Sequence, residues 1–227
     1  MTPTLLSQLY RDIEDGLNRK LHHGTDLPWM KSKELDILVE LLDRLAPVRC
    51  LEWGAGASTS YFPARLPGLE HWLSVEHHGP WFEAVRARKR NPAVEVVFQP
   101  PDREDYRTRG RDGTLEDFRA YVTLPEARGE RYDFILVDGR ARAACLEVAF
   151  RRADDLGIVV LHDANREAYR AALPPFAYQE LFTDWRKNRG GLLLASKGRP
   201  IHEVLDVERH RRLWRHHDLI AKTLFLR

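Results

Sequence analysis

Two glycines and a downstream acidic residue are the first groups in this sequence that could hold a small molecule. Gly54 and Gly56 directly follow an apolar segment, and glycine there permits a tight turn and a close approach of the backbone to a ligand. Glu76 ends the next apolar segment, where a carboxylate can accept hydrogen bonds from a ribose diol. NAD sites and adenosyl cofactor sites share this relationship. The pair therefore indicates a ligand that contains adenosine.

The residues around the glycines separate these two cofactor classes. A dinucleotide fingerprint has a third glycine where this chain has Thr59, and a carboxylate, Glu52, stands just before the loop. A carboxylate would repel a pyrophosphate, but it suits the ammonium and sulfonium groups of S-adenosylmethionine. The charge pattern thus favours the methyl donor. We expect the donor site to be formed by Glu52, Trp53, Gly54, Gly56, Ser58, Thr59, Glu76 and His77.

A second polar group follows two later apolar segments. Asp138 ends one of them and His162-Asp163 ends the other, so these side chains should meet above the reacting group. His162 could remove a proton from an attacking hydroxyl, with Asp138 or Asp163 orienting it. Alternatively, Asp138 and Asp163, with Asn165 or His162, could hold a divalent cation such as Mg²⁺ that lowers the pKa of the hydroxyl. In the blandest interpretation these residues only end strands and cap a helix.

Three arginines stand beside these acids. Arg140, Arg142 and Arg166 could bind an acidic acceptor such as a uronate or a phosphate, although arginine at the start of a helix is often only solvated. We carry them forward as candidate substrate-binding residues.

Alternating apolar strands and amphipathic helices must position these groups. Strands are expected at 48–53, 71–76, 94–98, 132–137 and 158–161, and helices at 33–45, 58–65, 80–90 and 141–154. The polar stretch 99–130 is too long for an ordinary connection and carries a further expected helix at 115–122. Continuously apolar strands with helices between them predict a parallel sheet that is covered on both faces.

The C-terminal third departs from this alternation. Two strands, 177–182 and 191–196, have no helical stretch between them and predict an antiparallel hairpin at the sheet edge. The tail 201–227 has a helical pattern. The predicted fold is therefore α/β: a Rossmann-like, doubly wound, mostly parallel sheet with an antiparallel edge hairpin and helices on both faces. We expect one domain, 1–227, with an N-terminal helical region (1–46), a cofactor-binding core (47–200) and a C-terminal helix (201–227) that could mediate homo-oligomerisation.

Composition and charge indicate the expected partners and the expected cellular location of the protein. The net charge is +2 and no aromatic interleaving accompanies the arginines, so nucleic acid is not an expected partner. No apolar run reaches the length of a membrane span, and no basic segment followed by an apolar core opens the chain, so we expect a cytoplasmic protein. Cys50 and Cys145 lie in apolar runs and are expected to be buried thiols.

Four stretches carry a resemblance to the class I methyltransferases. They read Glu-Trp-Gly-Ala-Gly-Ala-Ser-Thr at 52–59, Ser-Val-Glu-His at 74–77, Tyr-Asp-Phe-Ile-Leu-Val-Asp-Gly-Arg-Ala-Arg at 132–142 and Leu-His-Asp-Ala-Asn-Arg-Glu-Ala-Tyr at 161–169. These motifs resemble those of a bacterial subgroup of predicted methyltransferases and, more distantly, those of the plant glucuronoxylan methyltransferases. The resemblance covers roughly residues 30–196.

The resemblance implies where the donor binds and which chemistry follows. It implies that Glu52 lies near the methionine moiety and that Glu76 holds the ribose. Related methyltransferases with carboxylates at the later two strand ends use a metal, but here a histidine precedes Asp163 and Asn165 is not adjacent to it. The expected activity is methylation of a hydroxyl on a small molecule or sugar. Methylation of RNA or protein, and a non-catalytic module that binds an adenosyl cofactor, are the alternatives.

Overall fold

A seven-stranded sheet organises the chain. The computed structural model describes residues 4–20, 27–106, 112–186 and 188–223. The strands are β1 (Arg49–Trp53), β2 (His71–Glu76), β3 (Val94–Phe98), β4 (Tyr132–Val137), β5 (Ala153–His162), β6 (Tyr178–Phe182) and β7 (Leu192–Ser196). Their spatial order is β3-β2-β1-β4-β5-β7-β6. β1 to β5 run parallel, and β7 is antiparallel to both β5 and β6, so the predicted mostly parallel sheet with an antiparallel edge hairpin is confirmed.

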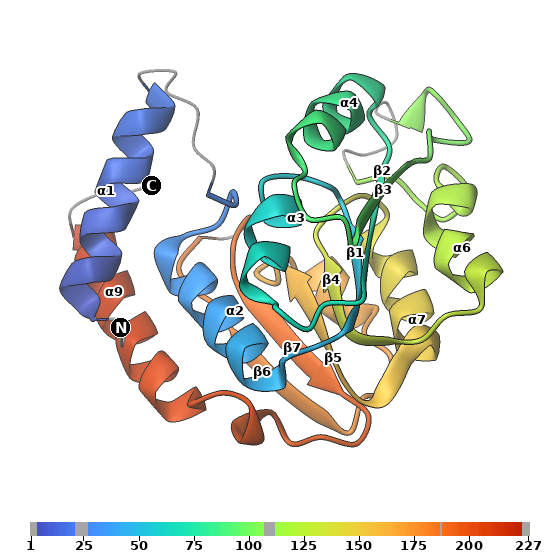
Figure 1. Cartoon of the computed structure of the whole chain (residues 1–227). Helices are drawn as coiled ribbons and strands as arrows, with labels where there is room; N and C mark the ends of the chain where they lie inside the picture. Colours follow the sequence, from blue (N-terminus) through green and yellow to red (C-terminus); the bar gives the residue numbers. More distant parts are fainter. Residues whose placement is uncertain (1–3, 21–26, 107–111, 187, 224–227) are drawn as a thin grey trace.

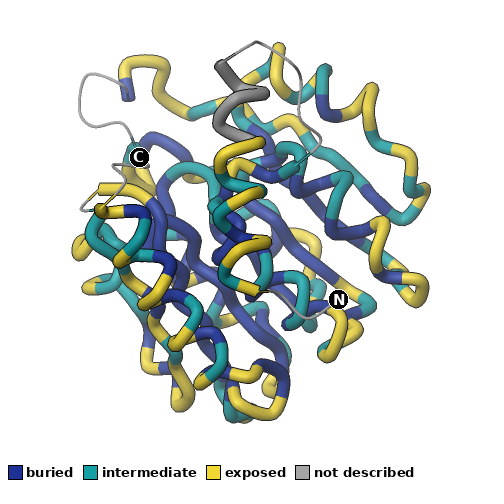
Figure 2. Tube along the Cα trace, turned by 90° about the vertical axis from the view of Figure 1, so that its left-hand side faces the viewer, coloured by how far each residue is buried: buried dark blue, intermediate teal, exposed yellow. Residues whose placement is uncertain are grey.

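Helices cover both faces of this sheet, as expected (Figure 1). They are α1 (Leu5–Lys20), α2 (Ser32–Leu45), α3 (Ser58–Tyr61), α4 (Gly79–Arg88), α6 (Arg119–Arg128), α7 (Arg142–Arg152), α8 (Glu167–Ala171) and α9 (Val207–Thr223), with 3₁₀ turns η1 (Pro63–Arg65) and η2 (Ile201–Glu203). One core cluster joins α6 and α7 to the sheet, and the other joins α2, η2 and α9 to the opposite face. In Figure 2 buried segments run through the centre. β1, β2, β4 and β7 are almost entirely buried, which explains their apolar sequences, whereas the edge strands β3 and β6 are mostly not buried.

The terminal helices pack on each other rather than on the middle of the sheet. α1 lies against α9 and α2, and Figure 1 shows α1 and α9 side by side. The predicted C-terminal helix is present as α9 up to Thr223, and residues 224–227 of that prediction lie outside the described part of the chain. A role for α9 in assembly stays a prediction. Among the described residues, no helix combines the length and the apolar character that a membrane crossing requires.

Two of the expected helices have different boundaries in the structure, each for a local reason. The helix expected at 58–65 is split into α3 and η1 at Pro63, which has no amide hydrogen to continue an α-helix. The helix expected at 115–122 begins at Arg119, because the Asp117 carboxylate accepts hydrogen bonds from Thr114 and closes a turn there. Residues 107–111 of the same polar stretch are outside the described residues.

Gly157 lies between the expected helix at 141–154 and the expected strand at 158–161, and in the structure it is part of a strand. β5 already begins at Ala153, and an added Cβ at Gly157 would lie 2.8 Å from the carbonyl oxygen of Tyr132 on β4. The pairing register shifts at this point. The absence of a side chain at Gly157 therefore permits the irregular pairing of β5 with β4.

Candidate active site

The loops after β1 and β4 meet at the point where the strand order reverses, which is where open α/β sheets bind ligands. Gly54 has a φ of 95° and donates its amide to Val75, while Asp138 donates its amide to the carbonyl of Trp53. A Cβ on Gly54 would lie 2.6 Å from the Cα of Gly139, so the two loops touch through backbone alone. By contrast, a Cβ on Gly56 would meet only the Ser58 hydroxyl at an ordinary 3.6 Å.

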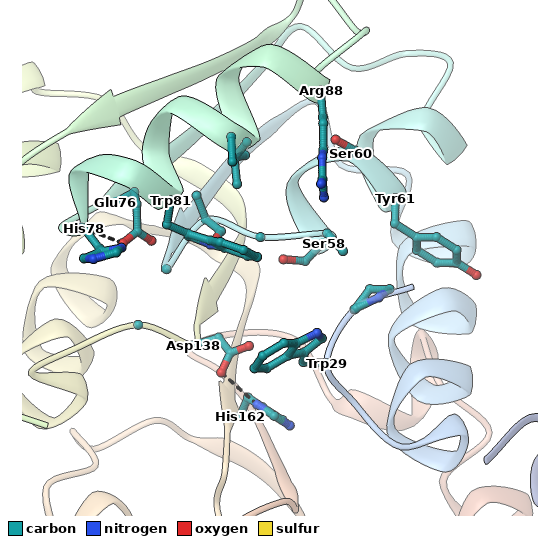
Figure 3. A pocket seen from close by; sticks show the side chains of 18 of the residues that line it. Trp29, Ser58, Ser60, Tyr61, Glu76, His78, Trp81, Arg88, Asp138 and His162 are labelled. Carbon is teal, nitrogen blue, oxygen red and sulfur yellow. Dashed lines mark hydrogen bonds and ion pairs between the residues drawn. The ribbon is translucent and has the colours of Figure 1, made fainter. Parts of the chain in front are cut away.

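A cavity of about 1190 Å³ opens over these loops (Figure 3). Ten residues singled out from the sequence line it: Gly54, Gly56, Ser58, Glu76, His77, Asp138, Arg140, Arg142, His162 and Asp163. The other five, Glu52, Trp53, Thr59, Asn165 and Arg166, do not.

Glu52 lies beneath the glycine loop instead of facing the cavity. Its fully buried carboxylate accepts hydrogen bonds from Ser58 (2.5 Å), Thr59 (2.7 Å), Ser74 (2.9 Å) and the indole of Trp72 (3.1 Å). Burial raises the pKa of Glu52 although these four donors oppose the shift. Its carboxylate therefore anchors the loop and the start of α3, and direct contact with a ligand ammonium is not part of this arrangement.

The indole beside the loop is Trp81, not Trp53. Trp53 is fully buried and donates its Nε1 hydrogen to the carbonyl of Tyr121 in the core. Trp81, in the first turn of α4, lines the cavity and donates its Nε1 hydrogen to the carbonyl of Ala55 at 2.6 Å. Figure 3 shows its ring lying across the cavity between Glu76 and Ser58. The sequence contained one signal for this residue, its place directly after the strand that ends in an acid.

Glu76 stands at the end of β2, as expected, and is almost fully buried. Its Oε1 accepts the amide hydrogen of His78 at 2.8 Å and lies 3.0 Å from Nδ1 of His77. In Figure 3 the carboxylate faces the cavity. This is the position that the sequence analysis assigned to a ribose partner.

His162 is held between two carboxylates. Its Nδ1 bonds to Asp138 Oδ1 at 2.8 Å, and its Nε2 lies 3.5 Å from Oε2 of Glu34. Burial alone would lower the pKa of His162, but the two carboxylates outweigh it and raise that pKa to about 10. These two carboxylates favour the protonated imidazole, which has no lone pair with which to accept a proton. The general-base role expected for His162 stays a prediction.

Glu34, which the sequence analysis missed, supplies one of these carboxylates from the first turn of α2. Its Oε2 accepts the amide of Lys31 (2.8 Å), and its Oε1 accepts both the amide of Gly191 (2.7 Å) and the guanidinium of Arg186 (2.8 Å). Burial would raise the pKa of Glu34, but His162, Arg186 and the amide donor lower it well below its usual range. A glutamate three residues into a helix is typical of a capping box, so its sequence position indicated only a local role.

Arg142 joins the ends of β4 and β5. It donates to the carbonyls of Gly139 (3.0 Å), Asp138 (3.1 Å) and His162 (2.6 Å). It also pairs with the carboxylates of Asp138 at 3.1 Å and Asp163 at 3.3 Å. The guanidinium is buried and its described bonds are internal, and binding of an acceptor by Arg142, which lines the cavity, stays a prediction.

Asn165 and Arg166 belong to the loop between β5 and α8. The Asn165 amide bonds to Asp184 at 2.8 Å, and Arg166 bonds to the hydroxyl of Tyr169 at 2.6 Å. Arg166 also pairs with Asp163 at 3.3 Å. Both side chains hold loops in place and lie outside the cavity lining.

The donor set does not fit the divalent cation that was considered. Across the described ranges, no group of three or more histidine, cysteine or acidic residues is arranged to hold a metal ion. Asp138 and Asp163 are bridged by the Arg142 guanidinium, and Asn165 points elsewhere. A fixed positive charge already occupies the position between the two carboxylates. Both cysteines, as expected, are buried free thiols.

Solved structures resemble this fold, whereas the sequence comparisons found no match. No protein-family model matches the sequence, and no curated protein matches it either. Among solved structures, a methyltransferase-like protein from Silicibacter pomeroyi is 19% identical to this chain with a TM-score of 0.53. The match covers 83% of this chain and 96% of that protein's chain. An O-methyltransferase from Bacillus cereus in complex with SAH is 16% identical with a TM-score of 0.51, covering 83% of this chain and 90% of its own.

A spermidine synthase bound to a transition-state analogue is also 16% identical, with a TM-score of 0.50 over 86% of this chain and 74% of its own. This chain has the class I methyltransferase fold. The spermidine synthase shares this fold, so the fold alone does not determine the reaction. The function has to be inferred from the residues of the site.

Proposed function

We propose that this protein is an S-adenosylmethionine-dependent methyltransferase that acts on a hydroxyl group of a small molecule or sugar. The observation that carries the proposal is the cavity at the topological switch point, where side-chain-free backbone at Gly54 and Gly139 adjoins two carboxylates, Glu76 and Asp138. Glu76 would accept hydrogen bonds from the ribose diol. The bound donor would supply an electrophilic methyl group.

Asp138 would provide the negative charge that the cationic donor needs. Burial would raise the pKa of Asp138, but the His162 and Arg142 cations lower it, so its carboxylate stays ionised. His162 and Arg142 both contact Oδ1, and the carboxylate lines the cavity. An ionised aspartate attracts an ammonium or a sulfonium, and it can accept a hydrogen bond from an acceptor hydroxyl.

In this mechanism His162 is a positioning residue. It fixes the rotamer of Asp138 through Nδ1 and is itself fixed by Glu34. With a depressed pKa, Asp138 is a weak base, so its contribution is to orient the hydroxyl and to stabilise positive charge. Acceptors whose hydroxyl is acidic, such as phenols, suit such a site best.

Calorimetry with S-adenosylmethionine and with its demethylated product tests the proposal directly. We expect micromolar binding of both ligands, and Glu76→Gln should weaken it about tenfold to a hundredfold, because bonds to a charged acceptor are the stronger ones. The control is Glu83→Gln, an exposed carboxylate on α4 paired with Arg86, which should bind like the parent protein. Absence of binding by the parent protein would refute the proposed cofactor.

A methyl-transfer assay tests the acceptor class. Label from the donor's methyl group should appear on phenols or sugars when panels of both are offered. Transfer to RNA or to protein alone would refute the hydroxyl acceptor while leaving the cofactor assignment intact.

A further inference from the structure

The cavity continues away from the strand ends into a groove between α3 and α4. α4 lines it with Trp81, Ala84, Val85 and Arg88, which lie on one face of a helix at intervals of three and four. Trp81 and Arg88 on this face are exposed, whereas Val85 is buried. The opposite wall is formed by Pro28, Trp29, Ser60, Tyr61 and Ala64. We call this part of the cavity the α3–α4 groove.

The walls of the groove carry aromatic side chains that are partly exposed. Trp29 is 76% exposed although it is a large apolar residue, and Trp81 is 40% exposed. Figure 3 shows the Trp29 ring reaching toward the cavity from the segment before α2, whereas the Tyr61 side chain on α3 extends away from Trp29. Exposed aromatic rings that face a shared cavity are typical of binding surfaces for flat ligands.

The far end of the groove is cationic. Arg88 and Arg90 both line it, and within the described part of the chain neither forms an ion pair or hydrogen bond. Their neighbour Arg86, by comparison, is paired with Glu83 at 2.8 Å. In Figure 3 the Arg88 side chain extends from α4 toward Ser60.

The charged lining residues differ between the two ends of the cavity. At the strand ends the acids Glu76, Asp138 and Asp163 are accompanied by Arg140, Arg142 and His162, whereas Arg88 and Arg90 line the opposite end with no acid beside them among the described lining residues. An anionic ligand is therefore attracted to the end with Arg88 and Arg90. The volume of about 1190 Å³ exceeds the roughly 300–1,000 Å³ of a pocket for one small ligand, so two ligands fit.

We propose that the α3–α4 groove binds an anionic aromatic molecule, with its flat ring between Trp29 and α4 and its acidic group at Arg88 and Arg90. The acidic group is a carboxylate, sulfonate or phosphate, which guanidinium groups bind through paired hydrogen bonds. The identification of this molecule as the methyl acceptor rests on the proposed function, while the binding site itself does not.

Two fluorescent dyes that share one ring system test the proposal. Anilinonaphthalene sulfonate carries an anionic group, and N-phenylnaphthylamine is the same ring system without it. Arg88→Gln should weaken binding of the sulfonate about tenfold, the effect of losing one charge-assisted contact, and change binding of the neutral dye by less than about twofold. The matched control, Arg86→Gln on the same helix, should leave both affinities unchanged.

A groove-filling variant locates the dyes. Ala84→Trp places an indole inside the groove and should reduce binding of both dyes at least about tenfold, because the ring site is then occupied. Urea unfolding of each variant verifies that it is folded. If Ala84→Trp binds both dyes like the parent protein, or if Arg88→Gln and Arg86→Gln behave alike, the proposal is overturned.

Calorimetry with S-adenosylmethionine distinguishes this proposal from the proposed function. Arg88→Gln should bind the methyl donor within about twofold of the parent protein, since Arg88 lies away from the donor's expected contacts. If the donor fails to bind the parent protein while the dye results hold, the proposed function fails and the groove stands. If Arg88→Gln weakens the donor instead of the sulfonate dye, the arginine binds the cofactor and the groove proposal fails.

Discussion

The two ends of the cavity are built in opposite ways. At the strand ends Glu34, Asp138, Arg142, His162 and Asp163, which we call the strand-end cluster, are mostly buried and bonded to one another or to backbone. In the α3–α4 groove most lining side chains are exposed or half-buried, and the guanidinium groups of Arg88 and Arg90 have no described partner.

The residues of the strand-end cluster form their contacts when the chain folds, whereas the groove residues form most of their contacts only when a ligand binds. Buried charges are tolerated only when they are paired, so the strand-end cluster has to be assembled before any ligand arrives. Exposed arginines and aromatic rings cost the folded protein little and gain most of their contacts on binding. The strand-end cluster should therefore respond to mutation through stability, and the groove through affinity.

The largest expected effect concerns the contact between the two loops at the strand ends. An added methyl group in Gly139→Ala would lie 2.0 Å from the Tyr121 hydroxyl and 2.8 Å from the amide nitrogen of Gly54. Backbone cannot move aside as a flexible side chain can, so we expect a loss of about 3 kcal/mol or more in the free energy of unfolding, together with loss of cofactor binding. Urea unfolding and calorimetry measure the two effects.

Two glycines of the same chain provide matched controls. Gly68→Ala meets no atom within 4 Å and Gly56→Ala meets only the Ser58 hydroxyl at 3.6 Å, so both should unfold within about 0.5 kcal/mol of the parent protein. A Gly139→Ala variant as stable as these controls would show that the two loops move independently.

These glycines also illustrate what could be predicted from the sequence. The apolar strands, their parallel arrangement and the edge hairpin follow from periodicity, because each strand's burial is recorded in its own residues. Gly54 and Asp138 were placed correctly at the cavity, because residues after parallel strands meet at one edge of the sheet.

What the sequence did not reveal depends on contacts between distant segments. Glu34 stands more than 100 residues before His162, and its helix-capping position gave no sign that it faces the sheet. For Arg142, the described partners are carbonyls that only the folded loops present. Trp53 and Trp81 have the same side chain, and only tertiary packing places one in the core and the other in the cavity.

The pH dependence of stability tests whether the strand-end cluster is charged as described. The folded protein raises the pKa of His162 to about 10, against about 6.5 for an unfolded histidine. A raised folded-state pKa contributes stability that is fully present below about pH 6.5 and is lost as the pH rises through about 10. The free energy of unfolding should therefore fall over this interval, by an amount on the order of a few kcal/mol.

Differences between variants isolate this contribution from other groups that titrate at high pH. His162→Gln should remove most of the fall, and Glu34→Gln should shift it to lower pH because one of the two flanking carboxylates is gone. His216→Gln, an exposed histidine on α9, should follow the parent curve. Parallel curves for His162→Gln and the parent protein would mean that His162 is neutral, which would support its candidacy as a general base.

The smallest expected effect belongs to Trp81, which joins the groove to the glycine loop. Trp81→Phe keeps an aromatic ring in the wall but loses the hydrogen bond to the carbonyl of Ala55. Since the side chain is 40% exposed, the free energy of unfolding should change by less than about 1 kcal/mol. Donor affinity should fall by about threefold to tenfold, because the loop that the donor approaches loses a tether worth roughly 1 kcal/mol.

Trp81→Ala distinguishes the tether from the wall. It removes the hydrogen bond and the ring together, so it should reduce donor affinity at least as much as Trp81→Phe and should also weaken both dyes, which Trp81→Phe leaves bound. If Trp81→Ala instead strengthens donor binding, the indole occupies the donor's place in the free protein. Trp81 would then resemble the strand-end cluster, because its contacts form on folding. The part of the cavity whose contacts form on ligand binding would begin beyond Trp81 on α4.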